Sequence, residues 1–157
     1  MTRWKAAPVC AFVLLAGLLL ANGASAADTQ ARLLKASEGL QMPGSEADSA
    51  WWFVSYPEER DLPEPERMAR VTGCPEGGIS RADFDVTLDD LGDVQPWMDL
   101  GQKQSARGFA RLQKAFHRHY GDLAVYRCET GTAEVPIYFL GLDGDGLSGL
   151  LTVNIET

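Results

Sequence analysis

Histidine and cysteine are scarce in this chain of 157 residues, which carries two of the former and three of the latter. Three cysteines are too few for a mini-protein built on disulfides or for a four-cysteine zinc site. The two histidines, His117 and His119, are two positions apart, so on a helix they point to different sides and do not share a metal ion. A P-loop, a dinucleotide fingerprint and a nucleophile elbow are also missing. These absences argue against the common enzyme classes and leave a carboxylate-based enzyme as the remaining catalytic alternative.

Basic residues are also in deficit, with 14 Lys and Arg against 22 Asp and Glu, a formal charge of -8. Direct binding of nucleic acid needs a surplus of cations to neutralise phosphate, so this balance argues against it. The hydrophobic fraction of 45% and the charged fraction of 23% are those of an ordinary globular protein. The composition therefore excludes a disordered tail, a fibre and a multi-pass membrane protein, and the length predicts one domain.

The first 26 residues have the pattern of a secretory signal peptide. Arg3 and Lys5 precede an uncharged run over 6–21, and the small residues of 24–27 supply an A-x-A cleavage site. The alternative is a transmembrane anchor, for which the uncharged run is almost long enough. We expect cleavage, a mature domain over 27–157, and a bacterial-type export to the periplasm or the medium without membrane attachment.

Two cysteines, Cys74 and Cys128, remain after the signal peptide and Cys10 are removed. In an oxidising compartment they are expected to pair, and two unrelated free thiols are the alternative.

The clearest predicted element is a helix over 102–120. Phe109, Leu112, Phe116 and Tyr120 recur on one face at helical spacing. Five basic residues lie on the other face, and Gly121 ends the helix. The basic residues are Lys103, Arg107, Arg111, Lys114 and Arg118.

The other elements are assigned from residue type and turn signals. Asp28 as N-cap and Gly39 as stop predict a helix over 28–39, and Pro65 favours a short helix over 64–72. Residues 82–91 fit a short strand or an irregular segment, and 92–100 fit a loop that carries Trp97. Strands are predicted over 50–56, 123–127, 135–140 and 147–156, the last two joined by a hairpin turn. The order predicts an α+β fold with a mostly antiparallel sheet packed by helices.

Charge is distributed unevenly along the chain. Residues 46–99 hold 14 acidic and 4 basic groups, a net of -10, which fits either a solvated surface or an acidic face for a basic protein partner. The last strand runs almost to the final residue, so Glu156 and Thr157 place a carboxylate, a hydroxyl and the α-carboxylate close together. These hard oxygen donors suit Mg²⁺ or arginine, although a strand that simply stops with the chain is the alternative.

Several segments in the same order resemble the nuclease A inhibitor family. They are residues 33–40, Asp83-Phe84-Asp85, and the stretches from Val125-Tyr126-Arg127 through Ser148-Gly149 to Glu156-Thr157. The resemblance covers about residues 31 to 157.

The resemblance implies an α-β-α sandwich that inhibits a sugar-non-specific DNA/RNA endonuclease of the metal-dependent kind. In this family the C-terminal threonine, here Thr157 beside Glu156, reaches the catalytic Mg²⁺ of the nuclease. An acidic residue after the first helix pairs with basic residues of the nuclease, and Glu46 with nearby Asp48 is the best match. A tryptophan-bearing loop joins the interface, and Trp97 with Asp99 corresponds to it.

We therefore expect a non-enzymatic, exported inhibitor of a basic metal-dependent nuclease, with no cofactor of its own and monomeric when free. One alternative is a binding module of the same fold that recognises another envelope protein. The other is a carboxylate enzyme whose cleft gathers two or more of Asp83, Asp85, Asp89 and Asp90.

Overall fold

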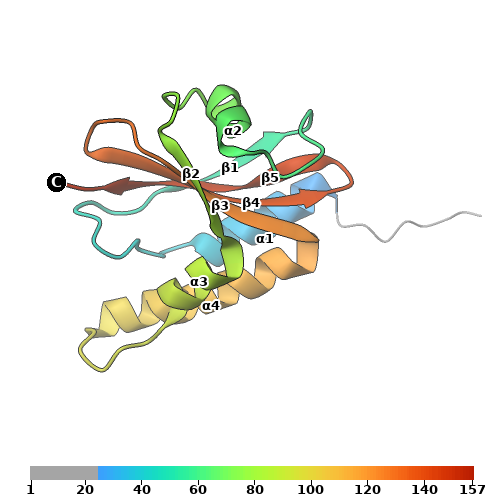
Figure 1. The fold of residues 1–157 in the computed structure, drawn as a ribbon. Helices are drawn as coiled ribbons and strands as arrows, with labels where there is room; N and C mark the ends of the chain where they lie inside the picture. Colours follow the sequence, from blue (N-terminus) through green and yellow to red (C-terminus); the bar gives the residue numbers. More distant parts are fainter. Residues whose placement is uncertain (1–24) are drawn as a thin grey trace, which may run out of the picture.

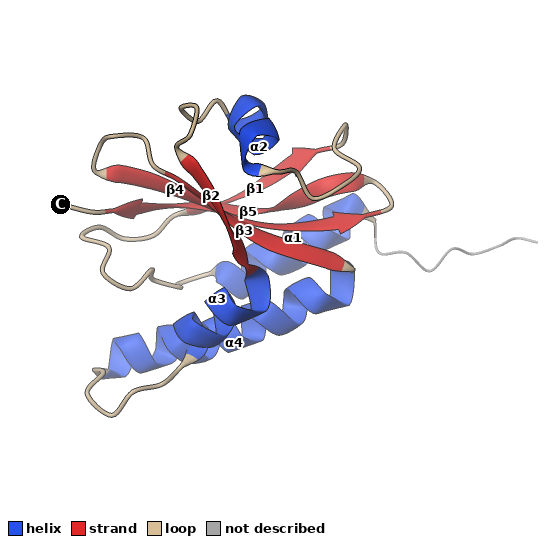
Figure 2. Ribbon diagram, in the orientation of Figure 1, coloured by secondary structure: helices blue, strands red, loops and turns tan. Residues whose placement is uncertain are grey.

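The computed structural model describes residues 25–157, so the predicted leader, with Cys10, lies outside the described residues except for its last two positions. The chain forms a three-layer sandwich around one five-stranded antiparallel sheet (Figures 1 and 2). The elements in order are α1 (Ala26–Ser37), β1 (Trp51–Tyr56), α2 (Pro65–Thr72), β2 (Ile79–Asp83), α3 (Phe84–Gly92), α4 (Leu100–His119), β3 (Asp122–Cys128), β4 (Glu134–Asp143) and β5 (Gly146–Ile155). The predicted α+β class and antiparallel sheet are confirmed.

The strand order is β1-β5-β4-β3-β2, so the C-terminal strand β5 lies between β1 and β4. In the register, Glu134 at the start of β4 faces Ile155 at the end of β5, and Trp51 faces Thr152. The chain therefore ends beside the segment that enters β1 and beside the β3–β4 connection. Figure 1 shows the C-terminus at the left end of the sheet and the start of α1 at the right end.

Helices α1, α3 and α4 cover one face of the sheet, and the short helix α2 covers part of the other (Figure 2). The predicted apolar stripe of α4 fills the larger core, because Phe109, Leu112 and Phe116 are fully buried and Tyr120 is nearly so. On the α2 side, Met68 and Tyr126 are fully buried, and the Tyr126 hydroxyl donates to the Pro63 carbonyl at 2.7 Å. The smaller core also holds Cys128, which is bonded to Cys74 as predicted.

The strand or irregular segment predicted over 82–91 is wrong, because this stretch is mostly helix α3. The Asp83 carboxylate accepts from the Val86 N–H at 2.9 Å and caps the helix. Phe84 and Leu88, four positions apart, are buried together on one side, whereas Val86 is 60% exposed. Phe84 and Val86 alternate in the sequence as in a strand, but only Phe84 is buried.

The first helix begins two residues earlier than predicted. Its N-cap is Ser25, whose hydroxyl accepts from the Asp28 N–H at 3.3 Å, so Asp28 lies in the first turn and is not the cap. Helix α4 likewise begins at Leu100, two residues before the predicted start at residue 102, because Asp99 caps this helix.

Candidate functional site

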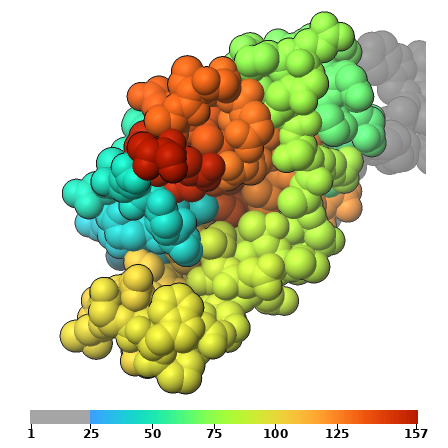
Figure 3. All heavy atoms as spheres, turned by 60° about the vertical axis from the view of Figure 1, so that its left-hand side comes forward, coloured from blue at the N-terminus to red at the C-terminus, as the bar shows by residue number. Residues whose placement is uncertain are grey.

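A cavity of about 1090 Å³ opens between the α1–β1 connection and the N-terminal half of α4. One wall is formed by residues 38–48, and the other comes from Leu91 and from positions between 97 and 111. Figure 3 shows the hollow between the cyan segment that follows α1 and the yellow loop and first turns of α4. We call this cavity the groove. It lies at the end of the molecule where the chain terminates.

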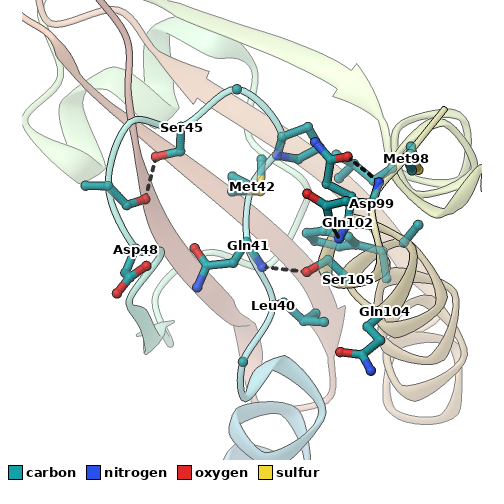
Figure 4. A pocket seen from close by; sticks show the side chains of 18 of the residues that line it. Leu40, Gln41, Met42, Ser45, Asp48, Met98, Asp99, Gln102, Gln104 and Ser105 are labelled. Atoms are coloured by element: carbon teal, nitrogen blue, oxygen red, sulfur yellow. Dashed lines mark hydrogen bonds between the residues drawn. The ribbon is translucent and has the colours of Figure 1, made fainter.

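Close packing between the two walls fixes the inner end of the groove. The Gln41 N–H donates to Ser105 Oγ at 3.2 Å, as Figure 4 shows, and the Trp51 indole donates to the Leu40 carbonyl at 3.1 Å. A Cβ on Gly108 would collide with the end of the Leu40 side chain, so the missing side chain at Gly108 lets Leu40 approach α4. These contacts join the α1–β1 connection to the helix behind it.

The outer wall carries Trp97 and Asp99. The Trp97 side chain is 73% exposed and that of Leu100, the first residue of α4, is 71% exposed. Asp99 Oδ1 accepts from the Gln102 N–H at 2.8 Å, and Gln102 Oε1 accepts from the Asp99 N–H at 2.9 Å. This capping box holds the end of the loop that carries Trp97 against the first turn of α4.

The C-terminus runs along the other wall. The Ile155 N–H donates to Ser45 Oγ at 3.2 Å, and the Glu46 N–H donates to the Ile155 carbonyl at 3.1 Å. The Thr157 hydroxyl donates to Glu46 Oε1, while Thr157 itself stays exposed. In Figure 3 the red C-terminal atoms rest against the cyan segment that lines the groove. The final threonine is therefore accessible and is not packed inside its own sheet.

The structure brings the six predicted partner-binding residues to one end of the molecule. Four of them line the groove: Glu46, Asp48, Trp97 and Asp99. The other two, Glu156 and Thr157, come directly after β5, and Thr157 contacts Glu46. Among the lining side chains, four are carboxylates and Arg111 is the one arginine, so the groove is predominantly acidic. An exposed tryptophan is a typical anchor in protein-binding sites, and the acidic side chains around it complement a basic partner.

The four aspartates of the enzymatic alternative lie elsewhere. Asp83, Asp85, Asp89 and Asp90 are exposed on or beside α3, and none of them lines the groove. His117 Nε2 lies 2.6 Å from Asp85 Oδ1, and this contact, together with a hydrogen bond from Gln113, lowers the pKa of the Asp85 carboxyl. Asp85 and Asp89 therefore tie α3 to α4, and in the described part of the chain the four aspartates do not gather in a concave site.

The comparison with protein families shows which family the chain belongs to. The profile of the nuclease A inhibitor-like proteins matches residues 27–157. The chain belongs to the nuclease A inhibitor-like family. Membership in this family suggests a role as a nuclease inhibitor and implies a nuclease as the protein partner. Comparison with curated proteins gave no match. Over residues 25–157, no helix is both long enough and apolar enough to cross a membrane.

Arg127 contacts Glu156, one of the predicted partner-binding residues, although sequence reasoning gave Arg127 no role of its own. It lies near the end of β3, and its guanidinium contacts Glu156 across the end of the sheet at 2.6 Å. The sequence places the two residues 29 positions apart, and nothing in their local patterns links them. Only the register of β3, β4 and β5 brings them together.

Proposed function

We propose that this protein is an exported inhibitor of a sugar-non-specific, metal-dependent endonuclease, and that it blocks the nuclease active site with the groove and the C-terminus. The observation that carries the proposal is the meeting of three segments at one end of the molecule. Glu46 contacts both Ile155 and Thr157, and it lines the same groove as Trp97. This arrangement supports the role in nuclease inhibition that the family suggests.

Charge supports a basic nuclease as the partner. Such an enzyme holds a polyanionic substrate and must present cations around its catalytic site. The acidic region over 46–99, with a net charge of -10, attracts such a cleft and speeds the encounter. The inhibitor then acts as a protein substitute for the substrate and makes no direct contact with nucleic acid.

The final residue supports a contact with the metal of the nuclease. Thr157 carries a hydroxyl and the α-carboxylate on an exposed end, and both are hard oxygen donors of the kind that Mg²⁺ prefers. Glu156, Asp48 and Asp99 extend the acidic surface around that end. The inhibitor supplies the ligand and holds no metal or cofactor of its own.

Export is supported by the leader pattern over 1–26 and by the bond between Cys74 and Cys128. Structural disulfides persist where the compartment is oxidising, as in the bacterial periplasm or outside the cell. The proposed inhibitor therefore meets its nuclease there, as a monomer before binding.

The experiment is a panel of purified metal-dependent nucleases mixed with the protein, with DNA cleavage as the readout. We expect stoichiometric inhibition of at least one basic member. Deletion of Thr157, or a peptide tag added after it, should weaken this inhibition sharply, because a bulky extension cannot enter a metal site. The same tag added before the mature N-terminus serves as the control, since Figure 1 shows the start of α1 at the opposite end of the sheet from the C-terminus.

Equal inhibition by the protein with the C-terminal tag and by the untagged protein would contradict the role of the terminus. Failure against every nuclease, together with recovery of an unrelated basic envelope protein in a native pull-down, would favour the binding-module alternative.

A further inference from the structure

Arg127 bridges the end of β3 to Glu156, the residue before the final threonine. Its Nη2 donates to Glu156 Oε2 at 2.6 Å, and its Nε donates to Glu129 Oε1 at 2.6 Å. The Arg127 side chain is 35% exposed, and those of Glu156 and Glu129 are 40% and 58% exposed. A planar guanidinium that bonds two carboxylates in this way restricts both of them.

Glu156 is held at three points. Besides Arg127, its second carboxylate oxygen, Oε1, accepts from Asn154 Nδ2 at 2.6 Å, and its N–H donates to the Ala133 carbonyl at 2.8 Å. The hydrogen bond from Arg127 is the main cause that lowers the pKa of the Glu156 carboxyl. Both oxygens of this side chain are therefore engaged within the protein, whereas the α-carboxylate that follows on Thr157 stays exposed.

The opposite side of the terminal segment is held by the groove wall. Ser45 and Glu46 contact Ile155, and Glu46 also accepts from the Thr157 hydroxyl. The chain end is thus fixed between Arg127 on one side and residues 45–46 on the other.

We propose that Arg127 is a positioning residue for inhibition, which acts through Glu156 and sets the direction in which Thr157 leaves the sheet. This inference rests on the proposed function, because it assigns the orientation of the same terminus. Glu156 then contributes mainly as an anchor, and Thr157 presents the oxygens to the partner.

The expected size of the effect follows from preorganisation. Ordering a flexible side chain at an interface costs affinity. The contacts of Arg127 with Glu156, which we call the clamp, order the two terminal residues before binding. Loss of the clamp should therefore weaken inhibition by roughly tenfold, since about 1.4 kcal/mol corresponds to a factor of ten.

The first test needs no nuclease. Backbone order parameters from ¹⁵N relaxation are measured for the terminal residues in the wild-type protein, in Arg127→Ala and in Glu156→Gln. Arg81→Ala is the matched control. The Arg81 side chain lies on β2, is 33% exposed and is paired with Glu64, and neither residue lines the groove. We expect Thr157 and Glu156 to lose order in the first two variants and to keep it in the control. Unchanged order in both variants would overturn the inference, whether or not the protein inhibits a nuclease.

The second test is a double-mutant cycle on nuclease inhibition with Arg127→Ala and deletion of Thr157. If Arg127 acts through the last residue, it costs roughly tenfold in the full-length chain and nothing further once Thr157 is gone. Additive losses would mean that Arg127 contacts the partner directly or supports the fold, and would overturn the positioning role. Thermal unfolding of each variant shows whether a loss of inhibition comes from destabilisation. If Arg127→Ala does not fold, Glu156→Gln takes its place in the double-mutant cycle. Wild-type protein that inhibits no nuclease would refute the proposed function alone.

Discussion

Removing the bond between Cys74 and Cys128 should cost stability and leave inhibition unchanged. The bond closes a loop with a sequence separation of 54 residues, from the end of α2 through β2, α3 and α4 to the end of β3. On the chain-entropy model, a cross-link of this span restricts the unfolded chain by about 4 kcal/mol. For a domain of this size, such a loss lowers the melting temperature by roughly 10–20 °C.

The native site should survive because the bond lies on the other face of the sheet from the groove. Cys128 packs in the smaller core with Met68, Tyr126 and Tyr138, whereas the groove forms between the α1–β1 connection and α4. Alanine replaces both cysteines in the test variant, since a serine at the buried position of Cys128 would add a hydroxyl that needs a partner.

The assay is urea unfolding of the oxidised protein, of the reduced protein and of the double alanine variant, followed by inhibition measured far below the unfolding midpoint. Reduction and substitution should lower the midpoint to a similar extent. Equal midpoints for all three samples would refute the entropic argument, and a loss of inhibition at full folding would refute the separation of the bond from the site.

Two further predictions concern the groove and the clamp. Trp97→Ala should weaken inhibition by tenfold or more while changing the free energy of unfolding by less than about 0.5 kcal/mol. The reason is that the ring is 73% exposed and contributes little to the core. A large fall in stability with unchanged inhibition would contradict this prediction. Arg127 lowers the pKa of Glu156, so the stabilisation from this pair is fully present above the ordinary carboxyl pKa and is lost as the pH falls through the lowered value. An NMR titration should therefore place the Glu156 midpoint below 4.5 in the wild-type protein and return it upward in Arg127→Ala; a wild-type midpoint at the ordinary value would count against the pair.

The parts of the fold that sequence predicted well are those set by local periodicity. The stripe from Phe109 to Tyr120 specifies α4 because each apolar residue falls on the same face, and the aromatic run 50–56 specifies β1. The turn before Gly146 joins β4 to β5 as the glycine and aspartate pattern predicted.

The errors came from short segments in which two patterns compete. The two apolar residues Phe84 and Val86 alternate as in a strand, but the cap at Asp83 and the burial of Leu88 favour a helix. At the first helix, the true cap Ser25 lies within the small residues of the predicted cleavage site, so Asp28 looked like the first capping residue.

The site was predictable only in part, because it depends on strand register. The terminal residues and Trp97 could be selected from the sequence, although their partner contacts stay predictions. Their meeting around one groove depends on β5 ending beside Glu46, and Gly108 leaves room for Leu40 against α4. Arg127 could not be selected, since its contact with Glu156 arises from the pairing of three strands.

The most direct test of the account places a paramagnetic ion in the catalytic site of an inhibited nuclease. With Mn²⁺ in place of Mg²⁺, the NMR signals of Thr157 should be broadened beyond detection in the complex, while those of Thr72 on α2, across the sheet from the groove, should keep their intensity. An inhibited complex in which the Thr157 signals remain sharp would show that the C-terminus does not enter the active site.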